Sequence, residues 1–246
     1  GELEIVKGLK YKIDASFDRL DWNDRKFVPP FELGWYYVTE NSEASLDIAT
    51  GSQSRTFLNN LLTYETTIGK HKFDALAGWV QERSDNYNHF SRGVGYTPGE
   101  ISHLEYADET TSGEYENTIT GISYLSRINY SYDDRYFIQG NFRQDKTSLF
   151  APENNTGNFY SFSGAWKISS EEFLHLPEWV SNIKVRGGYG ILGNNTIGVY
   201  AYAPTVNRFA GYDFNNEYAP GTTVVSAIDP NVHWEETKST NVALEL

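Results

Sequence analysis

The residue types that carry most catalytic and metal chemistry are sparse in this chain, which has no cysteine. Its five histidines are scattered without the spacing of a metal site, at His71, His89, His103, His175 and His233. A nucleophilic enzyme needs a nucleophile beside a base, and a metalloenzyme needs a ligand cluster. The sequence therefore predicts that the protein is not an enzyme and that it has no cofactor.

One group of side-chain oxygens could bind Ca²⁺. It consists of Asp18, Asp21, Asn23 and Asp24. The segment lacks the glycine and the terminal glutamate of an EF-hand loop. No metal site is predicted, although calcium binding by the loops stays open.

Aromatic residues make up 15% of the chain, and several lie in what we expect to be long connections. These candidates for contact with a substrate or partner are Trp22, Trp35, Tyr36, Tyr37, Tyr87 and Tyr96. Aromatic faces bind sugar rings well, because the negative face of the ring attracts polarised C–H groups. The alternative interpretation is simple packing within the loops.

The elements that position these residues are strands. Segment 9–18 interleaves apolar residues from Leu9 to Phe17 with charged or polar ones from Lys10 to Asp18, which predicts a strand with one apolar and one polar face. About eight such segments follow one another. Ser169 precedes Glu172 in the form of a capping box, which predicts one helical turn there.

The connections between these strands alternate between short and long. They are short at 69–71 and 133–135, and long at 18–53, 85–117 and 193–235. This alternation is typical of an outer-membrane β-barrel, with short turns on the periplasmic side and long loops outside. A complete small barrel or a soluble β-sandwich, acting as a glycan-binding or adhesion module, is the alternative. Extraction of the protein without detergent would exclude a location in the membrane.

The polar face predicts a lumen. The residues expected to face it are Lys12, Asp14, Arg127, Asn129, Asn141, Arg143, Asp145, Lys184 and Arg186. Eight strands enclose a lumen only wide enough for their own side chains, and the chain ends on Leu246 instead of an aromatic residue. We therefore expect part of a larger barrel.

The net charge of −13 argues against nucleic acid as a partner, since phosphate binding depends on lysine and arginine. The acidity lies in the predicted long loops, where it could serve solubility, divalent cations or a cationic partner. The absence of methionine predicts a processed chain or a fragment.

Four runs of residues carry a family resemblance. They are 143–150 (RQDKTSLF), 159–173 (FYSFSGAWKISSEEF), 183–200 (IKVRGGYGILGNNTIGVY) and 229–241 (DPNVHWEETKSTN). In this order they resemble the R-x-D-x-S-S-x-F, F-P-S-x-S-x-x-W-x-I-S-x-E-x-F, L-K-[LV]-R-x-x-Y-G-x-x-G-N and N-P-x-L-x-W-E signatures of SusC/RagA-type TonB-dependent outer-membrane transporters. The departures are small: Tyr160 stands where proline is usual, and Lys146 and Thr147 where glycine and serine are common.

The resemblance implies that residues 1–246 are part of one β-barrel domain of about twenty-two strands, of which this chain supplies about eight. The plug, the TonB box and the C-terminal strands would be absent. It also implies a location in the outer membrane of a Gram-negative bacterium, in contact with its lipid. The expected function is import of oligosaccharides or peptides with a SusD-like surface lipoprotein, energised by the TonB-ExbB-ExbD complex through the missing N-terminal part.

Overall fold

The structure is a computed structural model that describes residues 1–32, 40–41, 43–97, 102–174, 177, 182–214, 217–226, 228–229 and 231–246. Its elements are strands and two short 3₁₀ helices. They are β1 (Glu2–Val6), β2 (Leu9–Val28), β3 (Phe31–Glu32), β4 (Glu40–Asn41), β5 (Ser45–Ile68), β6 (His71–Val94), η1 (Leu104–Tyr106), β7 (Glu109–Tyr132), β8 (Tyr136–Thr147), β9 (Thr156–Lys167), η2 (Ile168–Ser170), β10 (Lys184–Asn194), β11 (Val206–Phe214), β12 (Glu217–Val224) and β13 (Glu235–Glu245).

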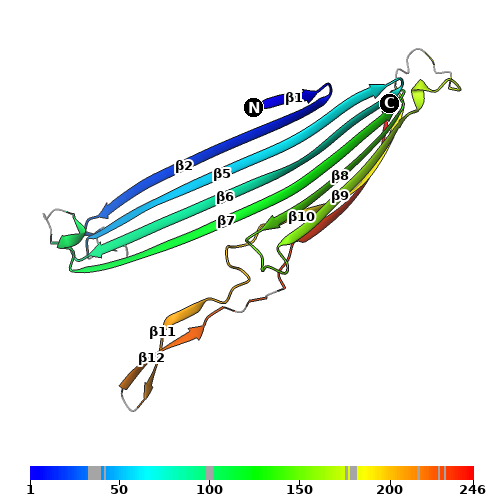
Figure 1. Cartoon of the computed structure of the whole chain (residues 1–246). Coiled ribbons are helices and arrows are strands. Elements are labelled where there is room, and N and C mark those ends of the chain that lie inside the picture. Colours follow the sequence, from blue (N-terminus) through cyan, green and yellow to red (C-terminus); the bar gives the residue numbers. More distant parts are fainter. Residues whose placement is uncertain are drawn as a thin grey trace. The chain divides into compact units, whose positions relative to one another are not determined.

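Nine strands form one sheet in the order β1-β2-β5-β6-β7-β8-β9-β10-β13 (Figure 1). The nine strands follow one another in the sheet in the same order as in the chain. The strand pairs whose register is described are antiparallel. Two small hairpins, β3-β4 and β11-β12, are separate sheets. The predicted all-β, antiparallel, up-and-down architecture is confirmed, and β1 adds one strand to the eight expected.

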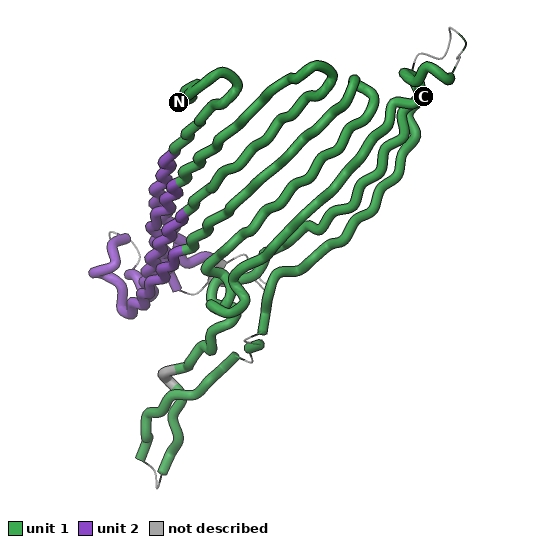
Figure 2. The backbone as a smooth tube through the Cα atoms, turned by 45° about the vertical axis from the view of Figure 1, so that its right-hand side comes forward, with its two compact units in different colours: residues 1–15, 57–82, 119–246 green, residues 16–56, 83–118 purple. Residues whose placement is uncertain are grey.

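The chain divides into two compact units, coloured separately in Figure 2. Unit 1 comprises residues 1–15, 57–82 and 119–246, and unit 2 comprises residues 16–56 and 83–118. Unit 1 contains the short turns and the well-paired strands β8, β9, β10 and β13. Unit 2 contains the distal parts of β2, β5, β6 and β7.

The expected bounds of two long loops are wrong at both ends. The segments 18–53 and 85–117 were expected to be loops, yet β2 continues to Val28, β5 begins at Ser45, β6 continues to Val94 and β7 begins at Glu109. The apolar and polar alternation fades in these distal parts, because both faces of the strand carry polar residues there. Backbone hydrogen bonds do not depend on that alternation, so the strands continue where the sequence pattern ends.

The two predicted tight turns are confirmed. Gly69 has a φ of 60° between β5 and β6, and Asp133 and Asp134 have φ of 53° and 52° between β7 and β8. Two successive residues with positive φ make a turn whose twist matches that of the flanking strands. Asp and Gly tolerate this backbone region better than other residues, which explains why they stand there.

The predicted helical turn is present as η2, but the predicted capping box is wrong. The residue that precedes η2 is Lys167, which makes no side-chain capping hydrogen bond, and η2 ends before Glu171. Glu171 instead accepts hydrogen bonds from residues of two strands, as described below. Among the described residues, no helix has the length and apolar character needed to cross a membrane.

Each unit has its own small core. In unit 1, Phe150, Phe159, Ile191 and Trp234 are buried together. In unit 2, the buried cluster consists of Ala44, Leu46 and Tyr96. The two cores are small because many apolar residues of the strands lie on an exposed face.

Candidate functional site

The sheet of unit 1 has one polar and one apolar face, which the register of β7, β8, β9, β10 and β13 defines. Residues directly opposite one another in antiparallel strands share a face. Two rows of the polar face are Arg127–Asn141–Ser161–Gly190–Ser239 and Asn129–Gln139–Ser163–Gly188–Asn241. Two rows of the apolar face are Ile128–Gly140–Phe162–Tyr189–Thr240 and Tyr130–Ile138–Gly164–Gly187–Val242.

The residues predicted to face the lumen share this polar face wherever the register is described. Arg143 and Asp145 lie opposite Leu125 and Ser123, in step with the polar rows. Lys184 and Arg186 continue the polar series of β10. Lys12 and Asp14 share one face of β2 and form an ion pair of 3.0 Å between Lys12 Nζ and Asp14 Oδ2.

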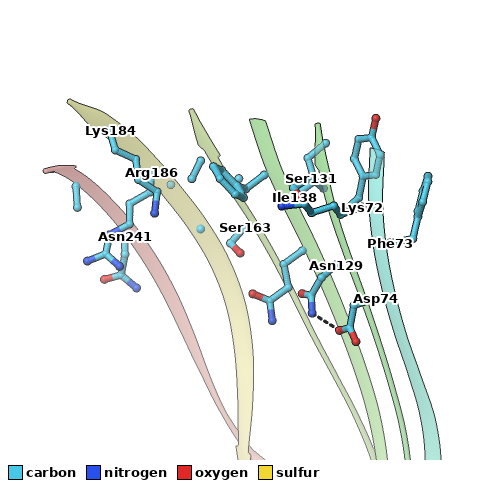
Figure 3. A pocket seen from close by; sticks show the side chains of 18 of the residues that line it. Lys72, Phe73, Asp74, Asn129, Ser131, Ile138, Ser163, Lys184, Arg186 and Asn241 are labelled. Atoms are coloured by element: carbon cyan, nitrogen blue, oxygen red, sulfur yellow. Dashed lines mark hydrogen bonds between the residues drawn. The ribbon is translucent and has the colours of Figure 1, made fainter. Parts of the chain in front are cut away.

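The polar face of unit 1 carries a cavity of about 1070 Å³ (Figure 3). Three of the predicted residues line it, namely Asn129, Lys184 and Arg186. Lys72, Asp74, Gln139, Ser163 and Asn241 also line it. These five share the strand parity of the predicted set, whereas Tyr130, Ile138 and Val242 of the apolar rows also line the cavity.

The charges around this cavity are compensated. On one side, Asn129 Nδ2 donates to Asp74 Oδ1 at 2.6 Å, and Arg127 lies 3.9 Å from the same carboxylate. On the other side, Arg186 Nε lies 3.0 Å from Glu245 Oε1, and Lys184 lies 3.8 Å from the same carboxylate. Neutral hydrogen-bonding groups of β8 and β9, Gln139 and Ser163, lie between the two sides. The wall is therefore suited to hydrated polar solutes, with no nucleophile and base pair among its described residues.

Acidic and basic residues at the short-turn end form a second constellation. Lys70 Nζ lies 2.7 Å from Asp133 Oδ2, and Arg135 Nε lies 3.3 Å from the same Asp133 oxygen. Lys70 holds the pKa of the Asp133 carboxyl below its ordinary value, mainly through this hydrogen bond. Arg135 also reaches Glu171, at 3.3 Å. Successive turns of the sheet are thus joined by ion pairs, and we call Lys70, Asp133, Arg135 and Glu171 the turn rim.

The motif residues of the C-terminal half meet in the core of unit 1. Phe150 comes from the first run, Phe159 from the second, Ile191 from the third and Trp234 from the fourth. The ring centroids of Phe150 and Trp234 are 5.5 Å apart, and those of Phe159 and Trp234 are 5.3 Å apart. This packing gives the four runs a structural role that spacing alone does not indicate.

This core also closes the base of the long connection 195–234. Asn194 and Glu235 are opposite each other in β10 and β13, and Asn194 Nδ2 donates to Glu235 Oε2 at 3.0 Å. The connection carries the hairpin β11-β12, whose Tyr212, Phe214 and Tyr218 are exposed. The loop therefore leaves the sheet and returns at one clamped point.

The aromatic residues predicted to contact a ligand lie in three different settings. Trp35, Tyr36 and Tyr37 lie outside the described residues. Trp22 is in β2 and Tyr87 is in β6, both partly exposed, so they belong to strands and not to loops.

Tyr96 is buried, which contradicts the prediction that it contacts a substrate or partner. It is only 6% exposed and packs edge-on against Phe27, with 5.7 Å between ring centroids. Burial raises the pKa of its hydroxyl. Its ring is part of the core of unit 2, which leaves no free face for a ligand.

The four candidate calcium ligands do not lie in a loop. Asp18, Asp21, Asn23 and Asp24 all lie within β2, where alternate residues point to opposite faces. Asp21 accepts hydrogen bonds from Arg19 Nε at 2.9 Å and Arg19 Nη2 at 2.8 Å. Among the described residues, no group of three His, Asp or Glu could hold a metal ion.

The known proteins that are similar in sequence to this chain are all TonB-dependent receptors by name. The TonB-dependent receptor SusC of Bacteroides thetaiotaomicron is 31% identical over 223 residues, which is 89% of this chain and 21% of that protein. The TonB-dependent receptors P26 and P3 of Formosa agariphila are 30% and 26% identical over 96% and 99% of this chain. The chain spans only 21% to 24% of the length of these curated relatives. No family model matches the chain.

Solved structures agree on the fold. The RagAB peptide transporter matches with a TM-score of 0.84 at 22% identity, over 99% of this chain and 27% of that chain. The RagAB peptide importer in its "open-open" state matches with a TM-score of 0.84 over 99% of this chain and 26% of that one. The four motif runs and the nine-stranded sheet therefore lead to the same group of proteins.

Proposed function

Because the chain resembles a barrel segment of the SusC/RagA-type TonB-dependent transporters over nearly its whole length, we propose that it is part of the wall of an outer-membrane transporter. This transporter imports oligosaccharides or peptides into a Gram-negative bacterium. The relatives are receptors and transporters by name, and one solved neighbour is a peptide importer. The chain contributes wall and loops to this function and no catalytic step.

The single observation that carries the proposal is the exposure of the apolar face. Ile128, Ile138 and Phe162 of unit 1 are each about 60% exposed. A soluble sheet covers such a face with a second layer, whereas a membrane barrel turns it toward lipid. The aromatic residues Tyr132, Tyr136 and Trp166 lie at the short-turn end of this face, as an interfacial girdle requires.

The polar face supports a water-filled passage. Lys12, Asp14, Arg127, Asn129, Asn141, Arg143, Asp145, Lys184 and Arg186 would line it. Their charges are paired with neighbours on the same wall, so the wall can stay hydrated without a fixed excess of either sign. A polar solute would pass along this face, and the cavity beside Asp74 and Arg186 would be part of its route.

The partners follow from the resemblance. A SusD-like lipoprotein would cover the extracellular mouth and meet the distal loops, including the β11-β12 hairpin with its exposed aromatic residues. The TonB-ExbB-ExbD complex would supply energy through a part of the transporter outside this chain. Trp22, Trp35, Tyr36, Tyr37 and Tyr87 are the candidates for contact with substrate or partner.

The test is solute uptake in the native host, with the full-length gene present, deleted, or restored on a plasmid. We expect deletion to abolish growth on one class of oligosaccharide or peptide and restoration to recover it, with no recovery in cells that lack TonB. The protein should leave the membrane only with detergent. Extraction into buffer alone, or uptake independent of TonB, would overturn the proposal.

A further inference from the structure

Two glycines of unit 2 are covered by aromatic rings from a neighbouring strand. A Cβ on Gly51 of β5 would overlap the indole of Trp22 in β2. A Cβ on Gly113 of β7 would lie 2.6 Å from Cε1 of Phe90 in β6. Each ring therefore occupies the space directly above a glycine and lies across the sheet. Trp22 is still 36% exposed and Phe90 is 52% exposed, so each keeps a free surface.

Both rings lie on the same face of unit 2. Asp47 and Gly51 are four residues apart on β5 and share a face by strand alternation. Arg92 and Phe90 share a face of β6 in the same way. Arg92 Nη1 lies 3.5 Å from Asp47 Oδ1, so the two pairs are on one face. We call this surface, defined by Trp22 and Phe90, the ring platform.

Planar polar groups accompany the rings. Asn86 Nδ2 donates to Asn117 Oδ1 at 3.0 Å, and by alternation these residues share the faces of Phe90 and Gly113 on β6 and β7. The Asp47–Arg92 pair lies on the same face. Exposed aromatic surface beside a few fixed amide, carboxylate and guanidinium groups is the composition of a small-molecule binding site.

We propose that the ring platform binds a neutral oligosaccharide by stacking pyranose rings on Trp22 and Phe90. One face of a pyranose presents polarised C–H groups, which are attracted to the negative face of an aromatic ring. The hydroxyls at the sugar edge can then exchange hydrogen bonds with the amides beside the platform. This inference rests on the proposed transport function and narrows its substrate class.

The separation of the rings favours an oligosaccharide over a single sugar. Trp22 lies over β5 and Phe90 lies over β7, with β6 between these strands in the sheet. Two strand spacings amount to about 10 Å, which is wider than one pyranose ring. A ligand that uses both rings therefore needs at least two linked sugars.

The same geometry disfavours a peptide. Peptides often bind by adding a strand to the free edge of a sheet, whereas the two rings lie over the faces of β5 and β7 at Gly51 and Gly113 and not along a strand edge. Glycine beneath each ring also fits a flat support for ring stacking better than a pocket for protruding side chains.

The test is binding to the purified full-length transporter in detergent, measured by calorimetry. The probes are maltohexaose, cellohexaose, mannohexaose, laminarihexaose and xylohexaose, and a neutral octapeptide mixture is the comparison. We expect at least one hexasaccharide to bind and Trp22→Ala and Phe90→Ala each to weaken it about tenfold. Trp22→Phe should keep most of the affinity. Gly113→Ala should weaken binding, because its Cβ displaces the ring of Phe90.

Phe17→Ala is the matched control, since Phe17 is an exposed aromatic residue of β2 with the opposite strand parity to Trp22. Loss of affinity in this variant equal to that in Trp22→Ala would overturn the inference. So would the absence of binding by every hexasaccharide, or peptide binding with the same dependence on both rings. If TonB-dependent uptake persists without saccharide binding, this inference fails and the proposed function stands. If the wild type shows no such uptake, the proposed function fails.

Discussion

The hydroxyl of Tyr136 donates a hydrogen bond to Oε1 of Glu171 at 2.6 Å, and the indole Nε1 of Trp166 donates to the same oxygen at 2.9 Å. The two rings are stacked, with 6.3 Å between centroids and 11° between planes. Tyr136 begins β8 and Trp166 is near the end of β9, so one carboxylate joins two strands at the short-turn end. Arg135 completes the site from the preceding turn.

The first prediction concerns pH. The hydrogen bond from Tyr136, followed by that from Trp166, holds the pKa of Glu171 below its ordinary value. A carboxyl with a lowered folded-state pKa adds stability above its unfolded pKa and loses it as the pH falls through the folded value. The temperature at which the folded barrel unfolds on a gel should therefore hold from pH 7 to 5 and decrease below about pH 4.

Glu171→Gln removes the titrating group, so its unfolding temperature should be lower at pH 7 and should change less below pH 4 than that of the wild type. Glu172→Gln is the control, because the Glu172 side chain is 93% exposed. Equal pH profiles for the wild type and Glu171→Gln would contradict the assignment of Glu171 as the anchor.

The second prediction concerns the environment of the two faces. Spin labels at Tyr11, Ile13, Tyr124, Ile128, Phe142, Phe162 and Val185 should be quenched by lipid-soluble oxygen. Labels at Arg127, Asn141 and Ser161, which form one row of the polar face, should be quenched by a water-soluble nickel chelate. If the water-soluble chelate quenched the labels on the apolar face more than oxygen did, that face would not be in contact with lipid and the membrane barrel would be excluded.

The third prediction is energetic. Ile128→Lys places a charge on the apolar face, and such a change costs about 2–4 kcal/mol at the bilayer midplane. Ser131→Lys, on the polar face of the same strand, should cost far less. Urea titration of the barrel in lipid vesicles measures both. Equal destabilisation would show that the two faces have the same environment.

The fourth prediction concerns the core that clamps the connection 195–234. Phe150 is 2% exposed, and truncation of a buried Phe to Ala costs about 3–5 kcal/mol. Phe150→Ala should therefore make this connection more sensitive to protease in intact cells. Leu192→Ala is the control, because Leu192 is adjacent to the core residue Ile191 but is 67% exposed. Unchanged cleavage in Phe150→Ala would show that the core does not hold the loop.

The faces of the strands were predictable from sequence, because strand alternation is local. Arg127, Asn129 and Asn141 were assigned to one face by parity alone, and the described register puts them there. The lengths of β2, β5, β6 and β7 were not predictable in this way. Beyond the apolar band both strand faces carry polar residues, and the alternation that marks a strand disappears.

Contacts between distant segments were also beyond local reasoning. Tyr96 is buried because Ala44 and Leu46 pack against it from another strand region. Glu171 lies inside the Ser169–Glu172 sequence that resembles a capping box, yet Tyr136 of β8 and Trp166 of β9 donate hydrogen bonds to it. The position of the Trp22 ring over Gly51 depends on the register between β2 and β5, which the sequences of the two strands do not indicate.

The turn rim has a mechanical consequence. Asp133 accepts a hydrogen bond from Lys70 in the turn of the preceding hairpin and lies against Arg135, and Arg135 reaches Glu171 in the connection between β9 and β10. The backbone follows the same path, since the amide of Asp133 donates to the carbonyl of Lys70 and that of Lys167 to the carbonyl of Arg135. A force applied to one hairpin is therefore shared with its neighbours. The rim therefore resists the separation of a single hairpin from the sheet.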